Sequence, residues 1–203
     1  MKKLNFLASI LLLGLVLCNT GCSSKKEVIE PEVGVLINGV TWATRNINAP
    51  GYFTAKPEDP GMFYQWNRKV GWSTTGNSPT SSPAGQTWNS TGDTGSSWTA
   101  ENDPCPPGWQ VPSEAQLQSL FNKFDRFDKF NDVSGGYFKD GTNEIFLPAA
   151  GCRNNDNCNL QEVGIWGYYY SNSNWVSMGF VDLGTDGGQA HSGIGMSIRC
   201  VKK

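Results

Sequence analysis

The sequence has few charged residues and only one histidine. Charged residues make up 17% of the 203 residues, the formal net charge is −2, and basic residues form no run longer than a pair. Nucleic-acid-binding chains neutralise phosphates with clustered basic side chains, so this composition argues against a nucleic-acid partner. His191 is the only histidine, which leaves little scope for histidine-based catalysis or for most zinc sites.

Long apolar runs are also missing. The run centred on residues 11–17 follows Lys2 and Lys3 and is short, whereas a membrane-spanning helix needs about 20 apolar residues. This layout predicts a secretory signal over residues 1–21. The signal ends at Asn19-Thr20-Gly21-Cys22, which resembles a bacterial lipobox, so Cys22 is predicted to be lipidated. Ordinary secretion with a free Cys22 thiol is the alternative.

A polar segment separates the predicted lipid anchor from the rest of the chain. Residues 22–34 are rich in charge and contain one proline, which predicts a solvated tether ahead of one domain over residues 35–203. Lys25-Lys26-Glu27 loosely resembles the export tags of surface lipoproteins of the Bacteroidetes. The sequence therefore predicts an outer-membrane lipoprotein that faces the cell surface and meets the membrane through its lipid anchor only.

Four cysteines fall in the predicted domain, and none forms a CxxC pair. An even number in an exported chain favours two disulfides, for which three connectivities exist. The polar residues between Cys152 and Cys158 turn readily and favour a local bridge, which would leave Cys105 to pair with Cys200. Metal ligation is the alternative, and the spacing disfavours it. No metal or other cofactor is predicted.

The first part of the domain predicts short strands and a long loop. Asn38-Gly39 within residues 35–43 is typical of a two-residue hairpin turn. Residues 73–100 are rich in Ser, Thr and Gly, which predicts a long irregular loop. Its Trp88 and Trp98 either pin the loop to the core, the favoured interpretation, or face a ligand.

A helix is predicted to begin at Ser113, which forms a capping box with Gln116. Its apolar stripe runs through residues 117–124 and continues at a spacing of three to Phe130. Beyond Gly135-Gly136 the sequence alternates between apolar segments and turns. Short strands are predicted at residues 136–138, 145–147, 167–171, 178–183 and 197–201, which indicates a small, mostly antiparallel α+β domain.

Several phrases within residues 35–203 occur in a characteristic order. They are Asn38-Gly39-Val40-Thr41-Trp42-Ala43-Thr44-Arg45-Asn46, Phe63-Tyr64-Gln65-Trp66, Cys105-Pro106-Pro107-Gly108-Trp109-Gln110-Val111-Pro112-Ser113, Leu147-Pro148-Ala149-Ala150-Gly151, Gly167-Tyr168-Tyr169-Tyr170-Ser171 and Ser197-Ile198-Arg199-Cys200-Val201. Together they resemble the Fibrobacter succinogenes major paralogous domain of exported Bacteroidetes lipoproteins. This family is similar to the C-type-lectin-like fold, which implies short twisted strands, two helices and long binding loops. The resemblance also implies the disulfide Cys105–Cys200, and it implies no common activity.

The predicted function is non-catalytic recognition, with glycan as the favoured ligand. The alternative is a protein-binding adhesion or surface-assembly component. Aromatic faces stack on sugar rings, and amide, carboxylate and guanidinium groups pair with sugar hydroxyls. The predicted ligand-binding residues are therefore Arg153, Asn154, Asn155, Asp156, Trp166 and Trp175. The competing interpretation is that the tryptophans are buried and residues 152–158 are only a stapled turn.

Calcium binding and catalysis have weaker support. Residues 154–157 resemble the start of an EF-hand loop, but the glycine and distant glutamate of such loops are missing. Ser192 beside His191 is a weak signal, because adjacent residues rarely form a nucleophile–base pair. Glu162 and Asp182 would suit a glycosidase, but any chain with 18 acidic residues offers such a pair. No catalytic residue is predicted.

Overall fold

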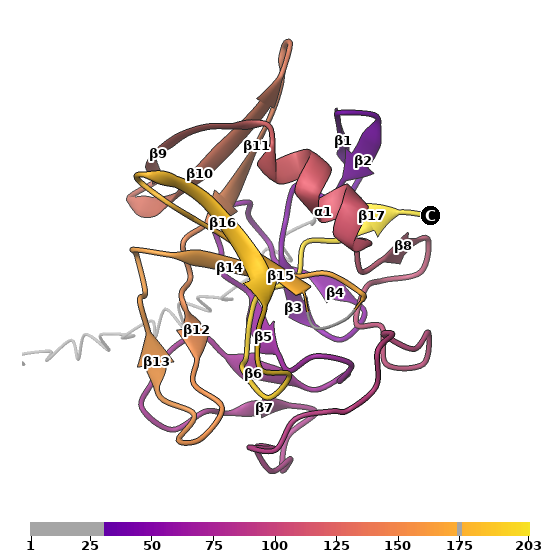
Figure 1. Ribbon diagram of the computed structural model, residues 1–203, viewed down its shortest axis with the longest axis vertical. Helices are drawn as coiled ribbons and strands as arrows, with labels where there is room; N and C mark the ends of the chain where they lie inside the picture. The colour runs from indigo at the N-terminus through magenta and orange to yellow at the C-terminus, as the bar shows by residue number, and fades with distance from the viewer. Residues whose placement is uncertain (1–30, 174–175) are drawn as a thin grey trace, which may run out of the picture.

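The computed structural model describes residues 31–173 and 176–203, which form small, mostly antiparallel sheets and one α-helix (Figure 1). The predicted signal over residues 1–21, Cys22 and Trp175 lie outside the described residues. The expectation of a small, mostly antiparallel α+β domain is confirmed at this level. Two helices were expected, and the described ranges contain one.

Within the described residues the strands are short and belong to six sheets. One sheet has the order β1 (Val35–Ile37), β2 (Val40–Trp42), β17 (Val201–Lys202) and β8 (Trp109–Gln110). Three sheets have three strands each: β11 (Asn143–Pro148), β10 (Val133–Asp140) and β9 (Phe124–Phe130); β14 (Gly167–Tyr170), β15 (Val176–Val181) and β16 (Gly184–Gln189); β5 (Met62–Tyr64), β6 (Gly71–Ser73) and β7 (Ser81–Ser82). Two pairs complete the set: β3 (Ile47–Ala49) with β4 (Tyr52–Phe53), and β12 (Cys152–Arg153) with β13 (Leu160–Gln161).

The predicted hairpin at Asn38-Gly39 is confirmed. Ile37 pairs with Val40 across a two-residue turn. Asn38 and Gly39 both have positive φ, at 49° and 78°, which is the backbone of a type I′ turn. The hairpin places Ile37 and Trp42 in the core, where both are fully buried.

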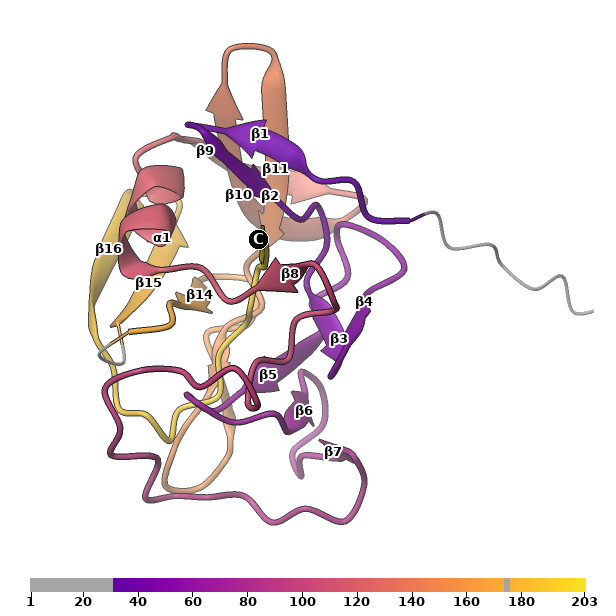
Figure 2. The ribbon, with the colours of Figure 1, turned by 90° about the vertical axis from the view of Figure 1, so that its right-hand side faces the viewer.

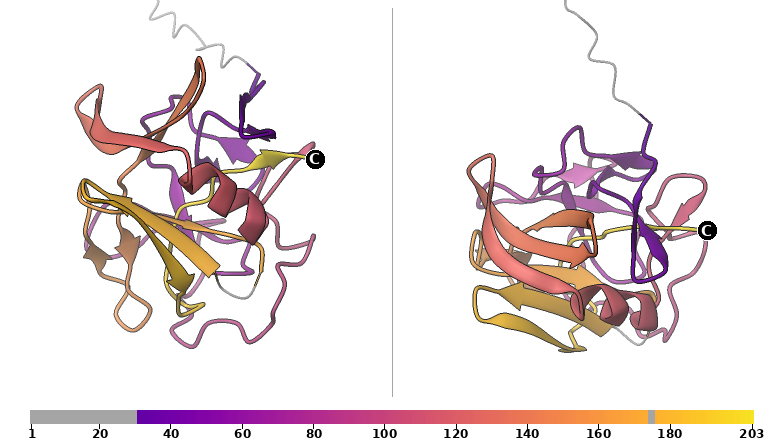
Figure 3. Two further views of the ribbon diagram at one scale, coloured as in Figure 1. Left: turned by 45° about the horizontal axis from the view of Figure 1, so that its top comes forward. Right: turned by 90° about the horizontal axis from the view of Figure 1, so that it is seen from above.

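The predicted helix start is also confirmed. Helix α1 (Glu114–Phe121) has Ser113 as its N-cap, whose hydroxyl accepts from the Gln116 N–H while the Gln116 side chain accepts from the Ser113 N–H. Leu117 and Leu120 are fully buried. The helix lies beside β15 and β16, as Figure 3 shows in its left view.

The predicted continuation of the apolar stripe was wrong, because residues 124–130 form strand β9. Phe138 pairs with Phe124 and Tyr137 pairs with Arg126, so Asp125 has no residue opposite. This bulge interrupts the normal alternation of a strand and brings Phe124 and Phe127 to one face, where both contact Phe180. A spacing of three therefore arises here from a bulged strand rather than from a helix.

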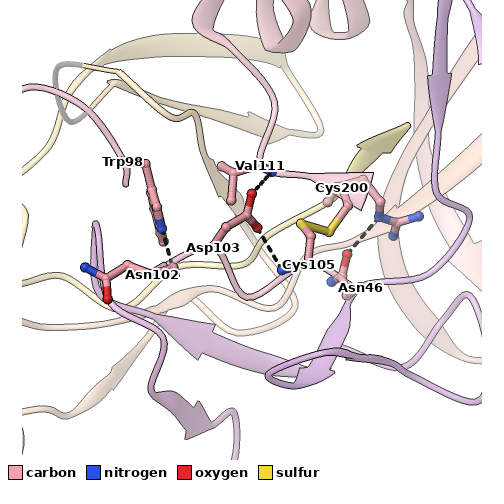
Figure 4. Close-up of a disulfide and its surroundings, with 8 residues drawn as sticks. Asn46, Trp98, Asn102, Asp103, Cys105, Val111 and Cys200 are labelled. Atoms are coloured by element: carbon pink, nitrogen blue, oxygen red, sulfur yellow. Dashed lines mark hydrogen bonds between the residues drawn. A yellow bond between two sulfur atoms is a disulfide. The ribbon is translucent and has the colours of Figure 1, made fainter. Parts of the chain in front are cut away.

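A core cluster surrounds the disulfide Cys105–Cys200, which has a Cα–Cα distance of 6.1 Å (Figure 4). This pairing was predicted and is present. The Asp103 carboxylate organises the turn beside it by accepting from the N–H groups of Cys105 (2.8 Å) and Val111 (3.2 Å). Burial raises the pKa of Asp103 even though these hydrogen bonds favour its charged form.

The long loop between β7 and β8 crosses the lower part of the molecule in Figure 2 and is pinned by its tryptophans. Trp98 is 9% exposed and contacts the rings of Trp66 and Tyr170. Trp88 packs edge-on against Trp72 and donates from Nε1 to the Asn155 carbonyl at 2.8 Å. Pinning, the favoured interpretation of these two residues, is confirmed.

Glu32 belongs to the domain although the sequence placed it in the tether. Its carboxylate lies 2.9 Å from Arg45 Nε, and the two side chains are 4% and 9% exposed. It also accepts from the Thr44 N–H and hydroxyl. Burial raises the pKa of Glu32, but the hydrogen bonds from Arg45 and Thr44 and the Arg45 charge outweigh it, so the net pKa lies below its usual 4.5.

We expect Glu32→Gln to lower the free energy of unfolding at pH 7 by about 2–3 kcal/mol, because it replaces the buried carboxylate that accepts from Arg45 and Thr44 by a neutral amide. Since folding lowers the pKa of Glu32, the ion pair stabilises the protein above pH 4.5 and loses this effect as pH falls through the folded-state pKa. Urea unfolding between neutral and acid pH measures this. Glu101→Gln, an exposed substitution, is the control, and equal acid sensitivity of Glu32→Gln and the native chain would contradict the account.

Candidate functional site

A shallow hollow of about 330 Å³ lies on one face of the β14–β15–β16 sheet. The opposite face carries Tyr169, Met178 and Phe180, which are buried in the core beneath α1. Because strand side chains alternate between faces, the residues between them point outward. The hollow is lined by Trp166, Tyr168, Ser177, Gly179, Asp186, Gly187, Gly188 and Gln189; we call it the Trp166–Tyr168 hollow.

Trp166 and Tyr168 form a stacked aromatic pair on this face. They are two positions apart, so they point to the same side. Their ring planes differ by only 5°, and the ring centroids are 5.5 Å apart. Both side chains are partly exposed. The pair therefore offers aromatic surface at the edge of the hollow.

Gly179 allows the two rings to lie close to the sheet. It pairs directly with Tyr168 across the β14–β15 ladder. A Cβ atom at Gly179 would lie 3.0 Å from Tyr168 Cδ1 and 3.2 Å from Trp166 Cε3, closer than these atoms normally pack. A side chain here would push the rings outward, so glycine sets the depth of the hollow.

Two carboxylates give the hollow its charge. The Tyr168 hydroxyl donates to the Glu162 carboxylate, and Asp186 pairs in register with Gly179 on the next strand. Burial raises the pKa of Tyr168, and the hydrogen bond to Glu162 and the charges of Glu162 and Asp186 raise it further. The phenol therefore stays protonated at any physiological pH, next to two acidic side chains.

A second hollow of about 500 Å³ lies on the other face of β16, against α1. Glu114 and Gln118 of the helix line it, together with Val176, Met178 and Thr185. Both hollows share residues 186–189. Strand β16 is thus an exposed edge strand with a depression on each side, and no Lys, Arg or His is among the described residues that line either one.

Arg153, a predicted ligand-binding residue, instead holds the interior together. Its side chain is fully buried. The guanidinium donates at 2.7–2.9 Å to the carbonyl oxygens of Ser73, Thr75, Gly76 and Cys158. These bonds connect β6 and the loop after it to the β12–β13 hairpin. The prediction that Arg153 binds ligand was wrong, because every one of these donors points into the protein.

Asn154, Asn155 and Asp156 form the turn at the tip of the β12–β13 hairpin. Asn154 Oδ1 accepts from the N–H groups of Asp156 and Asn157, and Asn155 Nδ2 donates to Asp156. The strands carry this tip away from Gly151, whose N–H donates to the Trp166 carbonyl (Figure 1). The structure therefore places these three residues apart from Trp166, and their polar side chains shape their own turn.

The second predicted disulfide was wrong, because Cys152 and Cys158 are both free thiols. Cys152 and Arg153 are consecutive in β12, so their side chains point to opposite faces. Cys152 is buried in the cluster around Cys105–Cys200, whereas Cys158 lies near the Arg153 guanidinium. Burial raises the pKa of Cys152 to about 12, so it is an unreactive thiol at neutral pH.

The weak catalytic signal at His191 and Ser192 has a structural explanation. The Ser192 hydroxyl donates to the Asp93 carbonyl and accepts from the Asp93 N–H. His191 Nδ1 accepts from the Gly193 N–H. The two side chains thus bond to different partners. Residues 31–173 and 176–203 hold no group of three or more His, Cys, Asp or Glu side chains close enough for one metal ion.

Sequence reasoning identified Trp166 but missed Tyr168, Gly179 and Asp186. The aromatic residues at positions 166 and 168 have the two-residue spacing of one strand face, which was an available signal. Strand β16 gave no signal, because its sequence Gly-Thr-Asp-Gly-Gly-Gln has low strand propensity. It forms by pairing with the buried strand β15.

No protein-family model, curated protein or solved structure matches the chain. The family resemblance of residues 35–203 therefore stays a prediction. In the part of the chain that the structure describes, no helix has the length and apolar character needed to cross a bilayer. The functional argument rests on the geometry of the Trp166–Tyr168 hollow.

Proposed function

We propose that this protein is a lipid-anchored, non-catalytic recognition module that binds a glycan in the Trp166–Tyr168 hollow. The observation that carries the proposal is the parallel aromatic pair, held against Gly179 and facing polar groups of an exposed edge strand. The apolar C–H face of a sugar ring packs on such aromatic surface, while its hydroxyls need nearby donors and acceptors.

The polar side of the hollow suits sugar hydroxyls. Asp186 offers acceptors, and the Ser177 hydroxyl offers both a donor and acceptors. Strand β16 is at the edge of its sheet and all its residues from Thr185 to Gln189 are exposed, so backbone N–H and C=O groups add to this set. The hollow is open rather than deep, which fits a short stretch of an extended glycan.

The anchoring part of the proposal rests on the N-terminal sequence. Lipidation at Cys22 would place the protein in the outer membrane, with the domain held outside by the tether. The structured chain begins no later than Glu32, whose carboxylate is bound to Arg45, so the tether between Cys22 and that contact is short. The C-type-lectin-like family proposed for residues 35–203 is consistent with a recognition role at this location.

Protein binding is the second candidate function, and strand β16 favours it. An edge strand presents unpaired backbone groups to which an extended segment of another protein can add. Three of the six residues of β16 are exposed or partly exposed glycines, so little steric bulk opposes such an approach. An adhesion or surface-assembly component would use this edge.

We expect Trp166→Ala to lower the affinity for the bound glycan about tenfold or more, because the aromatic contact is lost. Titration calorimetry of the full-length chain in a non-glycosidic detergent measures the change. Tyr52→Ala is the matched control, since Tyr52 is 70% exposed and lines a different hollow. An equal loss in both variants, or no loss in Trp166→Ala, would contradict the assigned site.

A further inference from the structure

We propose that the Trp166–Tyr168 hollow selects glycans that carry free amino groups, such as glucosamine oligomers, over N-acetylated and acidic glycans. This inference rests on the proposed glycan-binding function and specifies its ligand class. It follows from the charge and the aromatic surface that the hollow combines.

The charged residues that line or border the hollow in the described part of the chain are acidic. Asp186 lines it directly, and the Glu162 carboxylate lies at its edge, where it accepts from the Tyr168 hydroxyl. Across β16, Glu114 lines the neighbouring hollow. No lining residue is basic in either depression of the described chain. A uronic acid or sulfated sugar would meet only repulsion here, whereas an ammonium group finds a counter-charge.

The aromatic pair favours the same ligand class. The face of an indole or phenol ring carries negative electrostatic potential, so it attracts an ammonium group as well as the apolar face of a sugar. Tyr168 keeps its proton because burial and the adjacent carboxylates raise its pKa, and that proton is directed at Glu162. Because the Tyr168 hydroxyl donates its proton to Glu162, its oxygen can accept a hydrogen bond from a donor group of the ligand.

An N-acetylated sugar loses both advantages. Acetylation removes the positive charge, and with it the attraction to Asp186, to Glu162 and to the ring faces. Asp186 Oδ1 already accepts from the Gly187 N–H at 2.8 Å, which holds the carboxylate in place toward the strand edge. The selectivity therefore depends on a positioned carboxylate beside an aromatic platform rather than on net charge alone.

The test compares three tetrasaccharides, of glucosamine, of N-acetylglucosamine and of galacturonic acid, by titration calorimetry against the full-length chain in a non-glycosidic detergent at about pH 6. We expect the glucosamine tetramer to bind about tenfold more tightly than the N-acetylated one, from one exposed ion pair and one exposed cation–π contact. We expect the uronate tetramer to bind most weakly. Equal affinities, or a preference for the uronate, would overturn the inference.

Asp186→Asn removes the charge with little change in shape, and we expect it to reduce the glucosamine preference about threefold while the affinity for the N-acetylated tetramer stays the same. Asp182→Asn is the matched control, because Asp182 is an exposed acid that does not line the hollow. A preference that survives Asp186→Asn, or that falls equally in Asp182→Asn, would overturn the role of this carboxylate.

The pH dependence of the glucosamine affinity is an independent test of the amine selectivity. The groups facing the ligand are Glu162, Asp186, Tyr168 and, across β16, Glu114, and the thiol of Cys152 interacts with Tyr168 from within the core. Burial raises the pKa of Tyr168 and of Cys152, so both stay neutral from about pH 6 to 9, and a fall in glucosamine affinity over this range reports loss of the ligand's own proton. A pH-independent affinity would contradict the inference.

The results also separate this inference from the proposed function. If all neutral glycans bind as well as the amino sugars, and Trp166→Ala still weakens binding, the glycan function stands and the amine selectivity fails. If no tetrasaccharide and no other glycan binds the folded chain, both fail.

Discussion

Replacing Cys105 and Cys200 together by alanine is expected to lower the free energy of unfolding by about 4–5 kcal/mol. The disulfide joins residues separated by 95 positions, so its loss frees a long segment of the unfolded chain and raises the entropy of the unfolded state. Both cysteines also pack in the cluster that contains Trp66, Trp98 and Trp109. Because a small domain has about 5–15 kcal/mol of total stability, a large share would be lost.

Urea unfolding followed by tryptophan fluorescence measures this effect. Cys158→Ala is the control, since it removes a half-buried free thiol, and we expect it to cost less than about 1 kcal/mol. A second readout is the dependence of the free energy on urea concentration, which should become steeper in the double variant because its unfolded chain is more open. A double variant as stable as the control would contradict the role of the bridge.

Arg153→Met is expected to destabilise the protein by about 3–5 kcal/mol. The methionine keeps much of the apolar volume but leaves four carbonyl oxygens, those of Ser73, Thr75, Gly76 and Cys158, without their donor. An acceptor that loses its donor costs about 1–3 kcal/mol where water does not reach it, and Thr75 and Gly76 lie in an exposed part of the loop. The loop that follows β6 should then detach from the β12–β13 hairpin.

Arg126→Met provides the matched control for this substitution. Arg126 is exposed on β9, where it pairs with Asp125 and Glu144 and lies over the Tyr137 ring, so its loss should cost about 1 kcal/mol or less. Thermal unfolding and limited proteolysis at residues 74–80 would show the difference. If Arg153→Met stays as stable as Arg126→Met and loses glycan affinity instead, the interpretation of Arg153 as a buried structural residue is wrong.

Local sequence signals predicted the local structure well. Asn38-Gly39 specifies a turn with two positive φ angles, and Ser113 with Gln116 specifies a helix start, because each depends on chemistry within a few residues. The Cys105–Cys200 bridge also followed, from cysteine number and from the family resemblance. These features needed no knowledge of distant contacts.

Features that depend on distant contacts were not predictable in this way. Strand β9 shows a helical spacing because a bulge at Asp125 interrupts its alternation, and β16 has almost no strand propensity but pairs along the whole of β15. The Cys152–Cys158 bridge was predicted from the turn between the two residues, but their side chains lie on different sides of β12. In each case tertiary packing decided against the local pattern.

The residues of the candidate site show the same difference between local signals and distant contacts. Trp166 was predicted and lines the hollow, whereas Arg153 and residues 154–156 were predicted and serve the architecture of the β12–β13 hairpin. Polar residues in a loop look alike in sequence whether they bind a ligand or hold their own turn. Tyr168, Gly179 and Asp186 form one row across three strands, and only the strand register brings them together.

The most direct test of the account is a glycan-array screen of the full-length chain, in a non-glycosidic detergent, against the Trp166→Ala variant. The screen is run with calcium and with chelator, and an intact Cys105–Cys200 bridge is verified in each sample. The account predicts binding to one glycan class that chelator leaves unchanged and that Trp166→Ala weakens about tenfold or more. A folded, disulfide-bonded protein that binds no glycan, or that binds one equally well without Trp166, would contradict it.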